Sequence, residues 1–151
     1  MISTLNLKVK FRESFRPFAP AILKEYAKDY FEQIHLSPYM LLVDKLKESL
    51  HFKSPNTEKG FNKIKEKRSN VPAITHIDYT ARIQTVTKET NQRFYELINQ
   101  FYRKTGVPML INTSFNLKDE PIVYSPKDAI TCFRKTHIDV LVINNYIFLK
   151  K

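Results

Sequence analysis

The clearest pattern along the chain is a run of apolar residues at positions i, i+3, i+4 and i+7, which predicts one face of an α-helix. Those residues are Phe94, Leu97, Ile98 and Phe101. Thr90 or Asn91 can cap the start of this helix, because either side chain carries an oxygen that accepts from a backbone N–H. We expect Gly106 to end it, and Pro108 to prevent its continuation.

Two other segments are predicted to be helical. Ser125 and Pro126 open the first, with serine as the cap, proline in the first turn and Asp128 three residues after the cap. The residues expected to face inward are Ala129, Ile130 and Phe133. Residues 24–32 form the second, with three aromatic residues spaced for one face: Tyr26, Tyr30 and Phe31.

Short apolar runs predict strands at residues 39–43, 73–77, 81–86, 107–111, 121–124, 140–143 and 146–149. Asn144-Asn145 lies between the last two runs, and asparagine tolerates positive φ, so we expect a tight hairpin. Residues 15–23 contain Pro17 and Pro20, which lack ladder donors, so this segment is predicted to be an edge strand or an extended segment. Residues 1–12 alternate apolar and polar side chains, which fits a strand or a short helix.

This mixture of elements predicts an α+β (mixed α/β) fold, in which helices cover a twisted, mixed sheet. The chain has 151 residues, which fits a single domain. Residues 44–70 are polar and charged, and we expect them to form a flexible insertion with one helix.

Composition and charge narrow the class of protein and of partner. Hydrophobic residues make up 42% of the chain, as in an ordinary globular protein. The formal net charge of +10 favours anionic partners, which include nucleic acid, phosphate compounds and acidic protein surfaces. Cys132 is the single cysteine, so no disulfide can form within the chain, which fits a reducing cytoplasm. Its apolar helical surroundings predict a buried structural thiol, and no apolar run is long enough to span a membrane.

Glycine is too rare for the usual phosphate-binding loops. The chain holds only Gly60 and Gly106, so Walker and Rossmann signatures are absent from the sequence. Any nucleotide must therefore be bound by side chains or by the backbone of other residues.

Three cations near the start of the chain, Lys10, Arg12 and Arg16, form the first candidate site. On a strand, their even spacing would place them on one face. Together they could bind a phosphate-bearing substrate, since arginine offers a fork of donors that suits phosphate oxygens. If only these three residues are considered, the favoured interpretation is that they are solvated surface charges.

The second candidate set is His76, Asp78 and Arg82. On a strand, His76 and Asp78 point the same way and could hold a divalent metal or orient a general base. One histidine and one carboxylate do not make a metal site, so a structural hydrogen-bonded pair is favoured and no metal site is predicted. Arg82 lies between Ala81 and Ile83 in a pattern that predicts a half-buried side chain, which a bound phosphate or carboxylate would satisfy.

The third candidate is the polar stretch 112–116, directly after a predicted buried strand. Open sheets place ligands at the carboxyl ends of their strands. If the segment stays extended, Asn112, Ser114 and Asn116 project on one side and could recognise a planar, amide-like group such as a carbamoyl. An alternative that the pattern favours equally is a polar turn, in which these side chains bond their own backbone.

Taken together and in order, these segments resemble the C-terminal domain of the carbamoyltransferase family that includes nodulation protein U and the antibiotic O-carbamoyltransferases. The matching segments span almost the whole chain, at residues 5–6, 10–20, 72–78, 80–86, 105–108, 112–116 and 120–123.

The resemblance implies a fold like that of threonylcarbamoyl-adenylate synthase, the YrdC-like fold. It also implies that this domain takes carbamoyl phosphate and ATP, with Mg²⁺ on the ATP, and forms carbamoyl adenylate. A metal-holding N-terminal domain of the actin-like ATPase superfamily would then pass the carbamoyl group to an acceptor hydroxyl. We expect that domain to be absent from this chain, which starts where it would end.

The resemblance also implies roles for individual residues. Catalytic roles are expected for Arg82 and Ser114. The basic residues expected around carbamoyl phosphate are Lys10, Arg16 and Arg82. The polar strand end expected to hold the carbamoyl and phosphate groups is Asn112 with Ser114. The full substrate-binding set implied by the motif is Lys10, Arg12, Arg16, Asn112, Ser114 and Asn116.

Two positions depart from the family pattern. The family usually has glycine where this chain has Tyr79 and Asp119. Both replacements remove backbone freedom, so nucleotide binding is weakened if either glycine lets backbone approach ATP.

Two other hypotheses stay open at this stage. The net charge of +10 also suits a non-catalytic module that binds nucleotide or RNA, with an affinity that falls steeply with salt. The replaced glycines and the missing first domain suit a truncated or split remnant that works only with a separate N-terminal partner.

Overall fold

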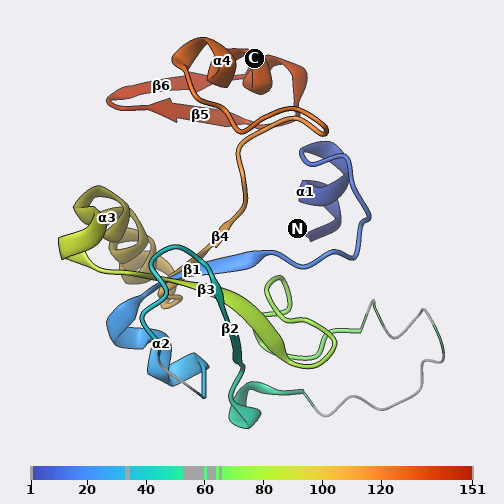
Figure 1. The fold of residues 1–151 in the computed structure, drawn as a ribbon, viewed down its shortest axis with the longest axis vertical. Helices are drawn as coiled ribbons and strands as arrows, with labels where there is room; N and C mark the ends of the chain where they lie inside the picture. The colour runs from blue at the N-terminus through green and yellow to red at the C-terminus, as the bar shows by residue number, and fades with distance from the viewer. Residues whose placement is uncertain (1, 33–34, 53–59, 61–63, 65, 151) are drawn as a thin grey trace. The chain divides into compact units, whose positions relative to one another are not determined.

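The computed structural model describes residues 2–32, 35–52, 60, 64 and 66–150. The chain divides into two compact units, which we call the terminal unit (residues 1–16 and 113–151) and the central unit (residues 17–112). Helices and strands occur in both units, which confirms the predicted α+β class (Figure 1). Two compact units can belong to one domain, and the single domain and the YrdC-like fold stay predictions.

The central unit is built on a four-stranded sheet with the strand order β2-β3-β1-β4. Its strands are β1 (Ala19–Leu23), β2 (Leu42–Lys45), β3 (Thr80–Val86) and β4 (Met109–Asn112). Strand β1 runs parallel to β3, whereas the β1–β4 and β2–β3 pairs are antiparallel. The sheet is therefore mixed, as predicted.

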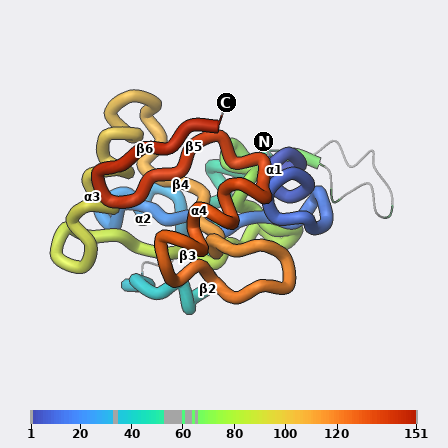
Figure 2. The backbone as a smooth tube through the Cα atoms, turned by 90° about the horizontal axis from the view of Figure 1, so that it is seen from above, coloured from blue at the N-terminus to red at the C-terminus, as the bar shows by residue number. Residues whose placement is uncertain are grey.

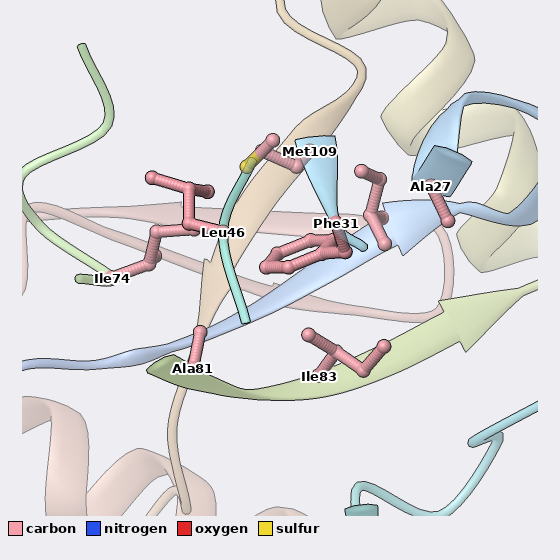
Figure 3. Close-up of a cluster of buried hydrophobic side chains, with 8 residues drawn as sticks. Ala27, Phe31, Leu46, Ile74, Ala81, Ile83 and Met109 are labelled. Carbon is pink, nitrogen blue, oxygen red and sulfur yellow. The ribbon is translucent and has the colours of Figure 1, made fainter. Parts of the chain in front are cut away.

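One face of this sheet packs against the main hydrophobic core, because alternate residues of a strand point to the same face. Strand β3 contributes Ala81 and Ile83, and helix α2 (Lys24–Tyr30) contributes Ala27. Figure 3 shows these side chains gathered around the ring of Phe31. The buried members of the cluster are Ile22, Ala27, Phe31, Leu46, Ile74, Ala81, Ile83 and Met109.

Helix α3 (Lys88–Thr105) covers one end of the opposite face, where its fully buried Ile98 packs with Ala21, Leu23 and Val86. Gly106 ends this helix as predicted, whereas the helix begins before the predicted cap residues Thr90 and Asn91. Asn91 has non-helical backbone angles inside α3, and its Oδ1 accepts from the backbone N–H of Phe94 at 3.1 Å. Gly106 takes the left-handed conformation, with φ of 73°. The helix starts earlier than expected because Thr87 caps an additional first turn.

The terminal unit holds α1 (Ile2–Lys8), α4 (Pro126–Lys135) and the antiparallel pair β5 (Val140–Ile143) and β6 (Tyr146–Leu149). The two strands run side by side in Figure 2. Ser125 and Asp128 form the predicted cap of α4, each side chain bonding the other's backbone N–H. Asn144 has φ of 52° in the predicted hairpin turn. The core of this unit centres on Ala129, Phe133 and Leu141.

Strand β1 corrects the prediction for residues 15–23, because it lies inside the sheet and not at an edge. Pairing with β3 begins only at Ala21, whereas Ala19 and Pro20 pair with β4 alone. Pro20 therefore lies where one side of β1 has no ladder, and a proline is tolerated there. In the described part of residues 1–12, which begins at residue 2, there is a short helix, α1, and no strand.

Two predicted strands are wrong. Residues 73–77 form a turn, because Thr75 Oγ1 donates to the carbonyl of Val71 at 2.9 Å and bonds Ser69 Oγ at 2.7 Å. Such side-chain bonds compete with a strand ladder. Residues 121–124 are irregular, because they begin with a proline that lacks a donor and the N–H of Val123 bonds the carbonyl of Phe115 within a loop.

The structure also differs from the predictions for the insertion at 44–70 and the strand at 39–43. The strand runs from Leu42 to Lys45, a short 3₁₀ turn follows at Glu48–Leu50, and His51 bridges Ser69. Residues 53–59, 61–63 and 65 of the insertion lie outside the described residues.

Candidate functional site

Lys10 lies in the terminal unit, just after α1, and its ammonium group contacts the stretch that follows β4. Lys10 Nζ donates to the backbone oxygen of Ser114 at 2.8 Å and to Oδ1 of Asn116 at 2.8 Å. The hydroxyl of Ser114 also donates to Asn116 Oδ1 at 2.8 Å. The structure thus brings together three of the predicted site residues, which we call the Lys10 cluster: Lys10, Ser114 and Asn116.

The strand on which Lys10, Arg12 and Arg16 would share a face does not exist. Helix α1 ends at Lys8, and Phe11 turns the chain with a φ of 49°. Arg12 Nε donates to Asn6 Oδ1 at 2.6 Å, and Asn6 Nδ2 donates to the backbone oxygen of Arg16 at 2.7 Å. A buried asparagine of α1 therefore joins the two arginines.

Sequence reasoning assigned no role to Asn6, although it lies in a segment that matches the family. Its side chain is completely buried, which is unusual for asparagine. A polar residue inside the first segment of the family motif was the available signal.

The three cations influence one another electrostatically. Burial lowers the pKa of Lys10, and the positive charge of Arg12 lowers it further. Burial also lowers the pKa of Arg12, with the charge of Arg16 as the next cause and Glu13 partly opposing it. The charged forms of Lys10 and Arg12 are thus disfavoured, and a bound anion would stabilise them.

The second group of site residues lies on the sheet of the central unit. Asn112 Nδ2 donates to Gln84 Oε1 at 2.7 Å, and Gln84 Nε2 donates to the carbonyl of Pro38 at 2.9 Å. Strand β1 runs between them, and its residues at these two levels are Ala19 and Ala21. Such small side chains leave room for the two amides to meet across β1. Strand periodicity puts Arg82 and Gln84 on one face, and the hydrogen bond to Gln84 puts the Asn112 side chain on that face too. We call these three residues the strand-face set.

Arg82 corrects one prediction, because its side chain is exposed and not half-buried. Its neighbours Ala81 and Ile83 point into the core, so Arg82 points to the opposite face. Helix α3 packs on that face at the Val86 end of β3, several residues away. An exposed arginine needs no buried acceptor, and it can meet an anion from solvent.

His76 and Asp78 do not lie on a strand. Asp78 Oδ1 accepts from the backbone N–H of Thr80 at 3.1 Å and from its hydroxyl at 2.7 Å. The hydroxyl bond is the main cause that lowers the pKa of Asp78. Asp78 therefore caps a turn. Across the described residues, no group of three or more His, Cys, Asp or Glu side chains is placed to hold a metal ion.

The two positions where the family usually has glycine keep a glycine-like backbone. Tyr79 has φ of 62° and Asp119 has φ of 63°, both in the left-handed region. The ring of Tyr79 stacks on His51, with 3.8 Å between ring centroids. Side chains therefore stand where the backbone conformation favours glycine.

The thiol of Cys132 is buried, as predicted. Burial raises its pKa, so the reactive thiolate is disfavoured. Among the helices that the structure describes, none has both the length and the apolar character needed to cross a membrane.

Comparison with known proteins identifies the family. A family model described as "Carbamoyltransferase C-terminus" matches residues 1–150. The chain belongs to this carbamoyltransferase C-terminal family. That result confirms the resemblance drawn from the sequence.

Named relatives agree with the family model. An uncharacterized protein of Synechocystis is 50% identical over 99% of this chain and 25% of its own length. Nodulation protein NolNO of Sinorhizobium fredii is 42% identical over 97% of the chain and 20% of its own length. Nodulation protein U of Rhizobium tropici is 33% identical over 95% of the chain and 22% of its own length. The chain thus spans about a fifth to a quarter of the relatives that it matches.

Proposed function

We propose that this carbamoyltransferase domain binds carbamoyl phosphate and ATP and forms carbamoyl adenylate. The observation that carries the proposal is the Lys10 cluster with Arg12 and Arg16 beside it. The pKa shifts of Lys10 and Arg12 show that burial and like charge disfavour their cationic forms in the protein alone. A bound phosphate anion would stabilise the cationic forms of both residues, which is the property expected of a phosphate-binding site.

The chemistry requires two steps. Water first cleaves the bond between the carbamoyl carbon and the bridging oxygen, or between that oxygen and phosphorus, and releases inorganic phosphate and carbamate. A carbamate oxygen then attacks the α-phosphorus of ATP, and pyrophosphate leaves with the electrons of the broken P–O bond. Both steps move negative charge between oxygens, so the protein contributes mainly by positioning and charge neutralisation.

The two groups of residues offer different chemistry to these steps. Lys10 and the Ser114 hydroxyl can bind phosphate oxygens, and the exposed guanidinium of Arg82 can neutralise charge as a phosphate group leaves. Asn112 has its amide nitrogen engaged by Gln84, which orients its carbonyl oxygen as an acceptor for a carbamoyl N–H. We therefore propose catalytic roles for Arg82 and Ser114.

Mg²⁺ is proposed to arrive with ATP. Magnesium prefers oxygen ligands and binds through one or two carboxylates together with substrate phosphates. The described residues hold no cluster of acidic side chains that could form a metal site without the nucleotide. When bound, the ion would neutralise charge on the pyrophosphate.

Transfer to an acceptor is proposed to require a second domain. The relatives are about four to five times longer than this chain, as their coverage of 20% to 25% implies. We propose that an N-terminal ATPase-like domain, in the same or a separate chain, delivers the carbamoyl group to a hydroxyl. We place this reaction in the cytoplasm, where the lone thiol stays reduced.

The test is carbamoyl-phosphate-dependent exchange of labelled pyrophosphate into ATP by the 151-residue chain. We expect exchange in the wild-type protein and its loss in both Arg82→Ala and Ser114→Ala. Omission of carbamoyl phosphate should abolish exchange as well. Equal exchange in the wild type and in both variants would contradict the assignment.

A further inference from the structure

The buried side chain of Asn6 bonds three separate groups of the loop that carries the cations, which we call the basic loop (residues 10–16). Its Oδ1 accepts from Arg12 Nε at 2.6 Å. Its Nδ2 donates to the backbone oxygens of Ser14 at 3.3 Å and Arg16 at 2.7 Å. One amide thus satisfies a cationic donor and two carbonyls at once.

The backbone of Asn6 holds the same arginine. The N–H of Arg12 donates to the carbonyl of Asn6 at 3.0 Å. This contact depends on Phe11, whose φ of 49° turns the chain back towards α1. Arg12 is therefore attached to Asn6 at both its backbone and its side chain, and the bond at Nε fixes the plane of the guanidinium.

The choice of an amide has an electrostatic consequence. A carboxylate is the strongest partner that a protein can offer an arginine, and it would neutralise the charge. Asn6 offers an oxygen of similar shape without the charge, and its nitrogen supplies donors that a carboxylate lacks. Asn6 thus holds the basic loop by hydrogen bonds without adding a negative charge next to its cations.

From this geometry we infer that Asn6 is a positioning residue for the phosphate group of the substrate. It holds Arg12 and the backbone at Arg16 against the mutual repulsion of the cations without reducing their attraction for an anion. The inference rests on the proposed function, since it assigns the basic loop to carbamoyl phosphate. No part of it requires Asn6 to touch the substrate.

The test is a calorimetric titration of the 151-residue chain with carbamoyl phosphate, compared between the wild type, Asn6→Ala and Asn6→Asp. We expect Asn6→Ala to raise Kd by about 10-fold, the effect of losing a hydrogen bond to a charged group. Asn6→Asp should raise Kd further, because its charge opposes the anion. A Kd within about twofold of wild type in both variants would overturn the inference.

Thr136→Val is the matched control. Thr136 is also a buried polar residue of the terminal unit, and its hydroxyl donates to the carbonyl of Cys132 at 2.9 Å. We expect this variant to lower the melting temperature and to leave Kd unchanged. A merely structural role for Asn6 would give the same result as Thr136→Val, with a lower melting temperature and an unchanged Kd in the folded fraction.

If the Asn6 variants do not fold, the inference can be tested on the wild-type protein by hydrogen exchange at Arg12. The Nε proton of Arg12 should then exchange slowly with solvent in the absence of substrate, as measured by NMR. Rapid exchange would overturn the inference. Failure of the wild type to bind carbamoyl phosphate would overturn the proposed function and the inference with it, whereas binding that is insensitive to Asn6 overturns the inference alone.

Discussion

The candidate site residues of the terminal unit lie in irregular segments beside α1, whereas those of the strand-face set lie on a sheet. The Lys10 cluster depends on bonds from side chains to the irregular stretch after Asn112, and on the attachment of the basic loop to Asn6. The strand-face set depends on register, because β1 places two alanines between Gln84 and Asn112. The irregular segments of the terminal unit bring several cations near one another. In the central unit, the register of the sheet fixes the distance between Gln84 and Asn112.

The two regions also differ in electrostatics. Lys10 and Arg12 have lowered pKa values because both are partly buried and near like charge. Arg82 is exposed on its strand. Removal of Lys10 or Arg12 should therefore change stability as well as binding, whereas removal of Arg82 should change function alone.

The largest expected effect is that of Arg82→Ala. We predict a loss of about 100-fold or more in carbamoyl-phosphate-dependent exchange, because charge stabilisation in the transition state is removed. The free energy of unfolding in urea should change by no more than about 0.5 kcal/mol, as for other exposed positions. Arg103→Ala, which changes an exposed arginine of α3, is the control and should leave both quantities unchanged. A large loss of stability in Arg82→Ala would contradict the prediction that this exposed residue affects function alone.

Lys10→Met should raise the Kd for carbamoyl phosphate by about 10- to 100-fold, the range for a hydrogen bond to a charged group. The same protonated lysine makes wild-type binding dependent on pH. Since burial and Arg12 lower the pKa of Lys10 from its ordinary value of 10.5, binding should weaken as pH rises through that lowered pKa. Titrations across the alkaline range test this, and a Kd that does not change with pH in the wild type would contradict it.

The stability of the same protein should change with pH in the opposite direction. Between the lowered pKa of Lys10 in the folded state and its ordinary value of 10.5, the unfolded chain binds more protons than the folded chain. The contribution of Lys10 to the free energy of unfolding therefore rises with pH in that window. Lys10→Met should remove this rise, which urea unfolding at several pH values would measure.

Gln84→Leu should have a smaller effect on binding. Its amide holds Asn112 in place by one neutral hydrogen bond, which contributes about 1 kcal/mol, or about fivefold in Kd for carbamoyl phosphate. The measurement is the same titration, with Gln100→Leu on the exposed surface of α3 as the control. An unchanged Kd in Gln84→Leu would show that Asn112 does not need this orientation.

The smallest effects are expected at the two positions with left-handed backbone. Tyr79→Gly should be more stable than Tyr79→Ala by about 1 kcal/mol, because alanine keeps the strain at φ of 62° while both variants lose the stacking on His51. The corresponding pair at Asp119 should show the same sign. Urea unfolding measures these differences, and an alanine variant as stable as its glycine partner would contradict the strain.

Much of the fold could be predicted from periodicity and turn chemistry. The pattern from Phe94 to Phe101 identified α3, and the cap at Ser125 identified α4. The apolar pattern of residues 73–77 wrongly predicted a strand. It could not reveal the turn, because Thr75 bonds residues four and six positions away. Pro20 suggested an edge, since the sequence does not reveal that β3 pairs with β1 only from Ala21 onwards.

The sequence named candidate residues that the structure brings together, but it did not predict their geometry, and their roles stay predictions. The motif identified Lys10, Ser114 and Asn116, and the structure brings them together by hydrogen bonds. Even spacing suggested a strand for the three cations, but Phe11 turns the chain with a left-handed backbone and Asn6 makes contacts that span up to ten residues. Arg82 was expected to be half-buried because the strand pattern gives the direction of a side chain without showing what covers it.

The most direct test of the proposed function is a calorimetric titration of the chain with carbamoyl phosphate, repeated with ATP and Mg²⁺. We expect saturable binding of carbamoyl phosphate, and its loss in the double variant Lys10→Met/Arg82→Ala. We also expect ATP with Mg²⁺ to bind the wild-type protein. An absence of carbamoyl phosphate binding in the wild type, or equal binding in the double variant, would contradict the central claim.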